Sequence, residues 1–114
     1  RESAPEDAEA AGTAGAKENR KAQRETAAAE RQQKIARRRP LLKESTQLEA
    51  RIATLEAERK ALEVKLADTA YYAQAPSAEV QATSRRCAEV IAELGDVEER
   101  WLEVHAELEA IGDA

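Results

Sequence analysis

The stretch LLKESTQLEARIATLEAERKALEVKL, residues 41–66, decides the fold. Its large side chains recur with alternating spacings of four and three residues, which is typical of the core positions of a coiled coil. Six of the eight core positions are Leu or Ile, and the exceptions are Ser45 and Arg59. Glu, Lys, Arg, Gln and Ala dominate between them, and these residues favour a helix and solvate its outer face. Such a narrow apolar stripe predicts a helix that needs a partner helix.

A second stripe further along the chain supplies this partner. Ten positions again alternate spacings of three and four: Val80, Thr83, Cys87, Val90, Leu94, Val97, Trp101, Val104, Leu108 and Ile111. Asp68, Thr69 and Pro76 interrupt the pattern between the two stripes, and Pro76 or Ser77 is expected to open the second helix. The sequence therefore predicts an all-α fold, an antiparallel coiled-coil hairpin over residues 40–114. We expect helices over about residues 40–68 and 77–111, joined by a turn over about residues 69–76.

The register of this hairpin has two solutions. Antiparallel packing places an a residue beside a d residue, so that the numbers of paired residues have a constant sum. A sum of 142 pairs Arg59 with Thr83, whereas a sum of 149 pairs Arg59 with Val90. The sum of 142 is favoured because it gathers polar residues into one layer, where a desolvated arginine has a partner.

The composition changes twice before the hairpin. Residues 1–16 hold six Ala and four acidic residues, carry a net charge of −3, and are predicted to form a disordered linker. Residues 17–39 carry nine Lys and Arg against three Glu, a net charge of +6, and are predicted to be basic and partly helical. Pro40 follows, so a new helix is expected to begin near Arg39, with one kinked continuous helix as the alternative.

The overall composition excludes several classes of protein. Only 3% of the 114 residues are aromatic and 36% are charged, which argues against a thick globular core. No apolar run approaches eighteen residues, and the first residues lack the apolar stretch of a signal peptide. The single cysteine, Cys87, suits a reducing compartment, so a cytoplasmic protein is predicted. Because the sequence begins without Met, we expect a fragment of a longer chain.

The common catalytic motifs are absent from the sequence. It contains no GxxxxGK[ST] phosphate loop, no GxGxxG, no CxxC and no HExxH. We therefore predict no enzymatic activity, no metal site and no cofactor in these residues. His105 is expected to be a solvated residue beside the seam, while Cys87 and Trp101 are expected to pack in the core.

The basic segment is the strongest functional candidate. Clustered Lys and Arg form an electrostatic footprint for phosphates. The residues predicted to contact nucleic acid before the hairpin are Arg31, Lys34, Arg37, Arg38 and Arg39. A second basic patch near the turn comprises Lys60, Lys65, Arg85 and Arg86. Tyr71 and Tyr72 also lie there, and one is expected to cover the end of the seam while the other is exposed for a stacking contact.

Two other interpretations of these features remain open. If residues 31–38 extend the first helix alongside the second, Glu103, Glu107 and Glu109 would neutralise part of the basic charge. The hairpin would instead be a protein-interaction or self-association module if its exposed apolar residues bound a partner. These residues are Ile35, Leu42, Ile91 and Leu102, and they form no continuous stripe in the predicted hairpin.

Four pieces of the chain, in order, resemble the C-terminal extension of ABC-F ATPases, which include the Uup-like proteins. They are KENRKAQRETAAAERQ (residues 17–32), RRPLL (38–42), LEARIATLEAERKALEVKLADTAYY (48–72) and VEERWLEVHAELE (97–109). The resemblance implies an antiparallel helical hairpin that a charged linker attaches to the second ATPase cassette. It also implies a function in binding DNA, or ribosomal RNA when the ATPase acts on the ribosome.

The resemblance therefore implies a non-catalytic nucleic-acid-binding module, with DNA, ribosomal RNA or transfer RNA as partner and no membrane. Because the two heptad stripes pair within one chain, the hairpin is expected to be monomeric. ATP and Mg would belong to the cassettes of the parent chain. The turn departs from the family pattern, which usually has Asp-Pro after Leu-Ala and again before the second helix. Here these pairs are Asp68-Thr69 and Ala75-Pro76, so the usual N-cap aspartate of the second helix is missing.

Overall fold

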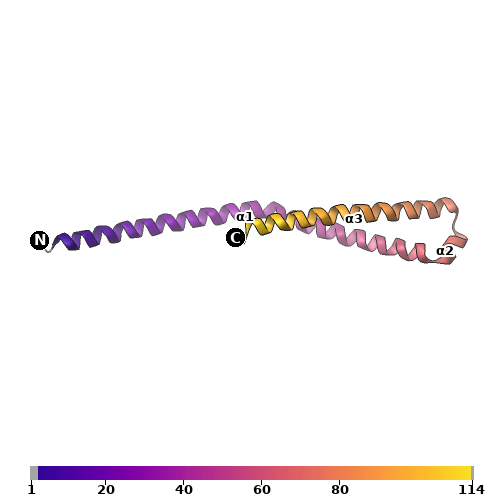
Figure 1. Ribbon diagram of the computed structural model, residues 1–114, viewed down its shortest axis with the longest axis horizontal. Coiled ribbons are helices and arrows are strands. Elements are labelled where there is room, and N and C mark those ends of the chain that lie inside the picture. The colour runs from indigo at the N-terminus through magenta and orange to yellow at the C-terminus, as the bar shows by residue number, and fades with distance from the viewer. Residues whose placement is uncertain (1–2, 114) are drawn as a thin grey trace.

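The structure, a computed structural model, describes residues 3–113, with side chains from residue 13 onward. It contains α1 (Ser3–Ala67), α2 (Thr69–Gln74) and α3 (Ser77–Ile111), and no strand in the described residues. α3 folds back along the second half of α1, which makes a rod with extents of 107 × 16 × 14 Å (Figure 1). The predicted all-α antiparallel hairpin is thus confirmed.

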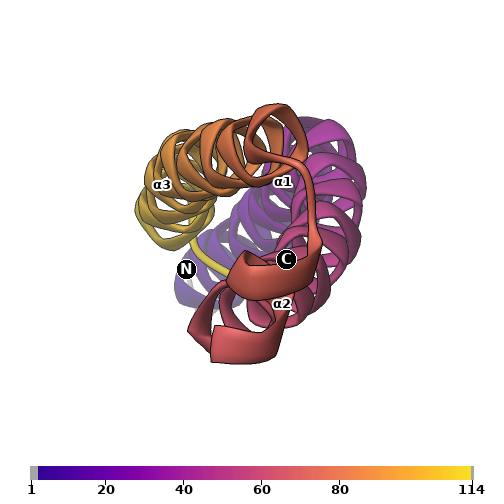
Figure 2. The ribbon, with the colours of Figure 1, turned by 90° about the vertical axis from the view of Figure 1, so that its right-hand side faces the viewer.

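α1 is much longer than α3, and its first half projects beyond the C-terminal end of α3 (Figure 1). We call residues 17–39 the stalk and residues 40–111 the hairpin. Seen along the rod from the turn, α1 and α3 lie side by side and curve around each other (Figure 2). No described segment combines the length and hydrophobicity that a membrane-spanning helix needs.

α1 continues through Pro40, which lies inside the helix. The expected helix start near Arg39 is therefore wrong, and the alternative of one continuous helix is observed. A proline inside a helix costs about 3 kcal/mol, but Arg38 just before it is hydrogen-bonded to the end of α3, which holds this part of α1 in place. Residues 3–16, where the sequence predicts a linker, have helical backbone, and residues 1 and 2 lie outside the described residues.

The core is one seam between α1 and α3. Leu55, Val90 and Leu94 form a buried cluster, and the half-buried Ile52, Leu62 and Val97 pack against it. The hydrogen bond between Ser45 and His105, at 2.8 Å, brings Ser45 level with Val104, which fits the sum of 149, so the favoured sum of 142 is wrong. The prediction treated Arg59 as a residue that needs a polar layer. Its guanidinium is instead partly exposed beside Glu63 on the same helix, with 3.9 Å between Arg59 Nε and the carboxylate, and this Nε is buried without a hydrogen bond among the described residues.

Polar side chains lie at the end of the seam that is near the C-terminus of α3. Near the end of α3, the hydroxyl of the buried Ser45 is hydrogen-bonded to His105 Nε2 at 2.8 Å. His105 is therefore half-buried rather than solvated as expected, and its ring centroid lies 4.0 Å from that of Trp101. Cys87 is a buried free thiol in the seam, as predicted.

The connection between the long helices contains the short helix α2. Asp68 caps its start, because its Oδ1 accepts a hydrogen bond from the Ala70 N–H at 3.0 Å. The hydroxyls of Tyr71 and Thr83 are hydrogen-bonded at 2.9 Å, so Tyr71 covers the end of the seam. Tyr72 is half-exposed, which matches the expected division between the two tyrosines.

Candidate nucleic-acid interface

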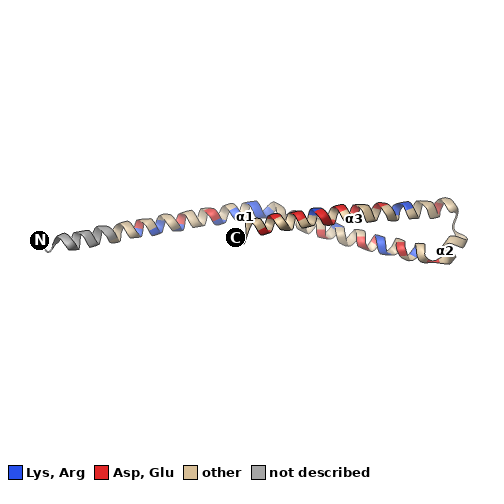
Figure 3. Cartoon of the chain, viewed as in Figure 1, with Lys and Arg blue, Asp and Glu red and all other residues tan. Residues whose placement is uncertain are grey.

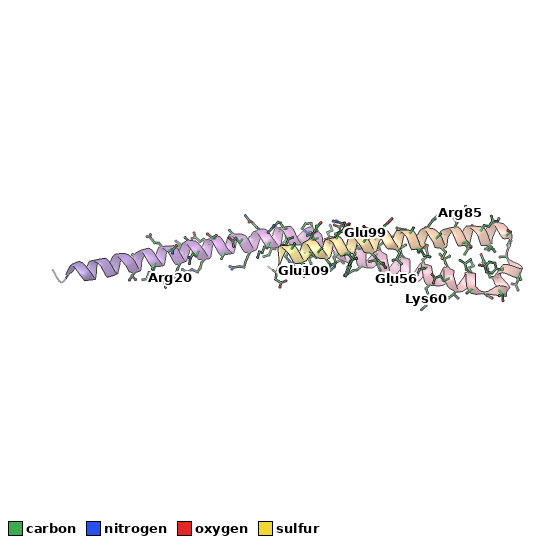
Figure 4. All side chains as sticks on the ribbon, in the orientation of Figure 1. Arg20, Glu56, Lys60, Arg85, Glu99 and Glu109 are labelled. Carbon is green, nitrogen blue, oxygen red and sulfur yellow. The ribbon has the colours of Figure 1, made fainter. Side chains whose placement is uncertain are left out.

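The stalk is a single helix whose cations have almost no partners. Arg31, Lys34, Arg37 and Arg39 make no hydrogen bond or ion pair with another described residue, and only Lys34 is half-buried. The upstream cations of the stalk are likewise exposed and unpaired, and Arg20 projects freely from it (Figure 4). Figure 3 shows this basic charge along α1 beyond the end of α3. The stalk therefore offers its positive charge to an external anion.

The stalk cations continue the heptad phase of the hairpin. Lys17, Arg24, Arg31 and Arg38 follow each other at intervals of seven residues and are in phase with Ser45. In the hairpin, these a positions face α3. In the stalk, nothing described faces Lys17, Arg24 and Arg31, because α3 ends at Ile111, and only Arg38 reaches its end. The seam of the coiled coil thus becomes a basic stripe where its partner helix ends.

Arg38 is the exception among the stalk cations. Its Nη1 donates hydrogen bonds to the carbonyl oxygens of Leu108 at 3.2 Å and Gly112 at 2.8 Å. Both carbonyls lie at the C-terminal end of α3, where the helix dipole favours a cation, and the Leu108 carbonyl also accepts from the Gly112 N–H at 3.1 Å. Gly112 has a φ of +84°, which glycine adopts without strain. Arg38 is therefore a cap of α3, and it marks the junction of stalk and hairpin.

The glutamates at the end of α3 do not neutralise the stalk. Glu103 and Glu107 lie 3.2 and 3.8 Å from Arg100 Nη1, and Glu109 has no cation within ion-pair distance among the described residues. Because Arg38 is level with the end of α3, Arg31 lies beyond the reach of these glutamates along the rod. The internal neutralisation weighed from the sequence is not observed.

The cations near the turn are only partly available. Arg86 donates from Nε and Nη2 to the carboxylate of Glu58 at 2.8 and 2.9 Å, and this hydrogen bonding raises the pKa of Arg86. Lys65 Nζ lies 5.0 Å from the ring centroid of Tyr71. Lys60 and Arg85 have no described partner, but they project from α1 and α3 to opposite sides of the rod (Figure 4). The structure does not gather the turn cations into one patch.

The two flanks of the hairpin seam differ in charge. Three ion pairs join α1 to α3 along the flank made by heptad g positions, which we call the g flank: Arg51–Glu93, Arg86–Glu58 and Arg100–Glu44. Hydrogen bonding between Arg100 and Glu44 raises the pKa of the guanidinium and lowers that of the carboxyl from its ordinary value of 4.5. The opposite side, the e flank, has no such pairs among the described residues.

Carboxylates without cations line this e flank. Glu49, Glu56 and Glu98 border an open hollow with Ile52, Ala53 and Trp101. Trp101 Nε1 donates to Glu49 Oε1 at 3.2 Å, and no Lys or Arg pairs with these three carboxylates in the described part of the chain. Sequence reasoning counted charge by segment and missed this asymmetry, although sorting the residues by e and g positions would have found it.

Among residues 13–113, no three His, Cys, Asp or Glu side chains are grouped closely enough to hold a metal ion. The candidate binding features of the described residues are two surfaces, the stalk with its free cations and the acidic e flank.

Comparison with family models matches residues 17–106 to the family described as ABC transporter C-terminal domain. The match begins at the first cation of the stalk and extends through the turn into the last turns of α3. No curated protein and no solved structure matches the chain.

Proposed function

The chain belongs to the ABC transporter C-terminal domain family, and on this basis we propose that it is the nucleic-acid-binding module of a cytoplasmic ABC-F ATPase. The family is an auxiliary domain rather than a catalytic one. In the proposed protein, ATP and Mg are bound by cassettes elsewhere in the parent chain. The stalk binds the phosphates of DNA, or of ribosomal or transfer RNA, while the hairpin supports the stalk.

The observation that carries the proposal is the unpartnered charge of the stalk. Eight of the nine Lys and Arg between residues 17 and 39, all except Arg38, have no described partner. When such cations neutralise phosphates, condensed counterions are released, which drives binding at low salt. No carboxylate among the described side chains forms an ion pair with these stalk cations. The hairpin cations Arg51, Arg86 and Arg100 are instead engaged in holding the two helices together.

The chemistry of the stalk favours backbone contacts over the reading of single-stranded bases. Residues 17–39 contain no aromatic side chain, and base stacking on aromatic rings is a main source of affinity for single strands. Lys and Arg contacts to phosphates carry little sequence information. We therefore expect binding to duplex DNA or structured RNA that depends strongly on salt and weakly on sequence.

The proposal is tested by fluorescence-anisotropy titrations of a DNA duplex and an RNA hairpin over a range of salt concentrations. The stalk variant is Arg31→Gln/Arg37→Gln/Arg39→Gln, which spares the capping residue Arg38. The matched control, Lys60→Gln/Lys65→Gln/Arg85→Gln, removes three cations near the turn.

We expect the stalk variant to bind at least about tenfold more weakly, because three phosphate contacts contribute about 2.7 to the slope of log K against log salt. The control variant is expected to bind like the wild type. Absence of binding by the wild type, or equal losses in both variants, would contradict the proposal. The two probes distinguish DNA from RNA as the preferred partner.

A further inference from the structure

The e positions of α1 form a stripe that is complementary to itself. Because α1 is continuous through Pro40, the residues at these positions lie on one face at intervals of seven. In order they are Lys21, Ala28, Ile35, Leu42, Glu49 and Glu56. The first half of this stripe is basic and then apolar, and the second half is apolar and then acidic.

We propose that two copies of the chain associate side by side and antiparallel through this stripe, each laying its stalk along the e flank of the other. The partner is thus a second copy, and the contact is salt-sensitive. This inference goes beyond nucleic-acid binding, requires no nucleic acid, and replaces the monomer expected from the sequence with a salt-dependent dimer.

The pairing follows from the numbering of the stripe. In an antiparallel pair of helices whose facing residues sum to 77, Lys21 faces Glu56 of the other copy, and Ile35 faces its Leu42. A two-fold axis near Arg38 and Arg39 repeats each contact, so a single arrangement forms two Lys–Glu pairs and two Ile–Leu contacts. This is the isologous geometry of most homodimers.

The lengths of stalk and hairpin fit this arrangement. The e-flank hollow lies near Ile52, which is about 20 Å from Arg38 along a helix that rises 1.5 Å per residue. The same distance in the other direction reaches Arg24 on the stalk. When the two junctions meet, Arg24 of each copy therefore lies level with the acidic hollow of the other.

The surfaces involved are exposed and lack partners within the chain. Leu42 is 47% exposed, and it lines an open hollow with Ile35, Arg38 and Arg39. Glu56 and Glu98 border the e-flank hollow without a cation within ion-pair distance, and like charges close together favour the approach of a cation. The stalk cannot supply it within one chain, because the continuous helix α1 carries the stalk away from its own flank (Figure 1).

Other pairings of two copies satisfy these charges less well. Two stalks, each with a net charge of +6, repel each other when they lie together. Two g flanks meet as surfaces whose ion pairs are already formed. The stalk on the e flank is the arrangement that brings unpaired cations to unpaired carboxylates.

Competition at the stalk is a consequence that rests on the proposed function. Lys21 and Arg24 contact the other copy in the proposed dimer, and the same two cations contact phosphates in the proposed complex with nucleic acid. A dimer formed in this way would hide part of the stalk from nucleic acid, and nucleic acid would separate the dimer.

Sedimentation velocity on the full chain at about 0.05 M and about 0.5 M salt tests the association. The charge-swap set comprises Lys21→Glu, Glu56→Lys and the double variant that carries both substitutions. Lys60→Glu is the matched control, because it makes the same charge change away from the stripe. Circular dichroism of each variant verifies that the helices are retained.

We expect a dimer at low salt and a monomer at high salt for the wild type and for Lys60→Glu. Each single swap is expected to weaken dimerisation about tenfold, because two pairs change from attraction to repulsion. The double variant is expected to regain the dimer, since each reversed Lys–Glu pair is then restored in the opposite sense.

Three results would overturn the inference. They are a wild type that remains monomeric at low salt up to about 0.1 mM, a double variant no stronger than the single ones, or a dimer that survives high salt. Anisotropy titrations of the same variants keep the two proposals separate. Nucleic-acid binding without a dimer contradicts only this inference, and a dimer without nucleic-acid binding contradicts only the proposed function.

Discussion

The stalk and the first arm of the hairpin are parts of one helix, α1, with one heptad phase, yet their seam positions differ completely. In the hairpin, a seam residue such as Leu55 is 1% exposed, and Leu94 opposite it is 4% exposed. In the stalk, Arg24 and Arg31 occupy equivalent positions and are exposed. A seam position stabilises the fold where an opposing helix buries it, and it is available to a partner where no helix opposes it. The presence of that helix matters more than the charge of the segment.

The same comparison separates the cations of the two regions. Arg86 and Arg100 of the hairpin bind carboxylates across the g flank. Arg37 and Arg39 of the stalk bind nothing in the described chain. Substitutions in the hairpin should therefore change stability, whereas substitutions in the stalk should change binding.

The largest expected effect on the free energy of unfolding comes from truncating a buried side chain of the seam. Leu55→Ala should lower the free energy of unfolding by about 2–5 kcal/mol, because it leaves a cavity beside Val90 and Leu94. Ile35→Ala in the stalk is the matched truncation and should change it by less than about 0.5 kcal/mol. Urea denaturation followed by circular dichroism measures both. Equal losses would show that the stalk is packed as tightly as the hairpin.

A substitution at the junction between the two regions should raise the free energy of unfolding instead of lowering it. Pro40→Ala restores a backbone N–H and relieves the clash with the preceding turn, so it should stabilise α1 by up to about 3 kcal/mol. Pro76→Ala, just outside the start of α3, serves as the control and should have a smaller effect. Thermal unfolding and helical content by circular dichroism report the difference. A loss of helicity in Pro40→Ala would mean that the proline is required where it stands.

A smaller effect is expected at the polar layer near the junction. Ser45→Ala removes the hydroxyl that is hydrogen-bonded to His105, which should cost about 1 kcal/mol. Ser84→Ala alters an exposed serine with no described partner and should be neutral. If both variants unfold at the same denaturant concentration, the buried hydrogen bond contributes nothing measurable.

The smallest effect concerns the pH dependence of the g flank. The Arg100 hydrogen bond lowers the pKa of Glu44 from 4.5. The contribution of Glu44 to stability is therefore fully present above that ordinary pKa and is lost as the pH falls through the lowered value. Thermal melts between neutral and acidic pH should show this decline, and Arg100→Gln should make it shallower. If stability declines with falling pH as steeply in that variant as in the wild type, the Arg100–Glu44 pair does not cause the decline.

The periodicity of the sequence was sufficient to predict the hairpin. Alternating spacings placed Cys87 in the seam, and the turn residues led to a division between a covering and an exposed tyrosine that Tyr71 and Tyr72 fulfil. Such patterns are reliable because each seam residue must be buried by a partner helix.

The register and the continuity of α1 could not be predicted in the same way. Two registers one heptad apart bury nearly the same apolar residues, so the choice depended on Arg59, whose Nε is buried without a hydrogen bond among the described residues in the observed register. Pro40 disfavours a helix locally, but the capping contacts of Arg38 with the end of α3 are visible only in the folded chain. The candidate cations were recognisable from their clustering, while their freedom depended on where α3 ends.

The central claim is that the stalk binds nucleic acid while the hairpin does not. An NMR titration of the ¹⁵N-labelled chain with a short DNA duplex, repeated with an RNA hairpin, tests it most directly. The account predicts amide shift changes concentrated in residues 17–39, with signals near Lys60 and Tyr72 unchanged. Shift changes concentrated at the turn or along α3, with the stalk unaffected, would contradict it.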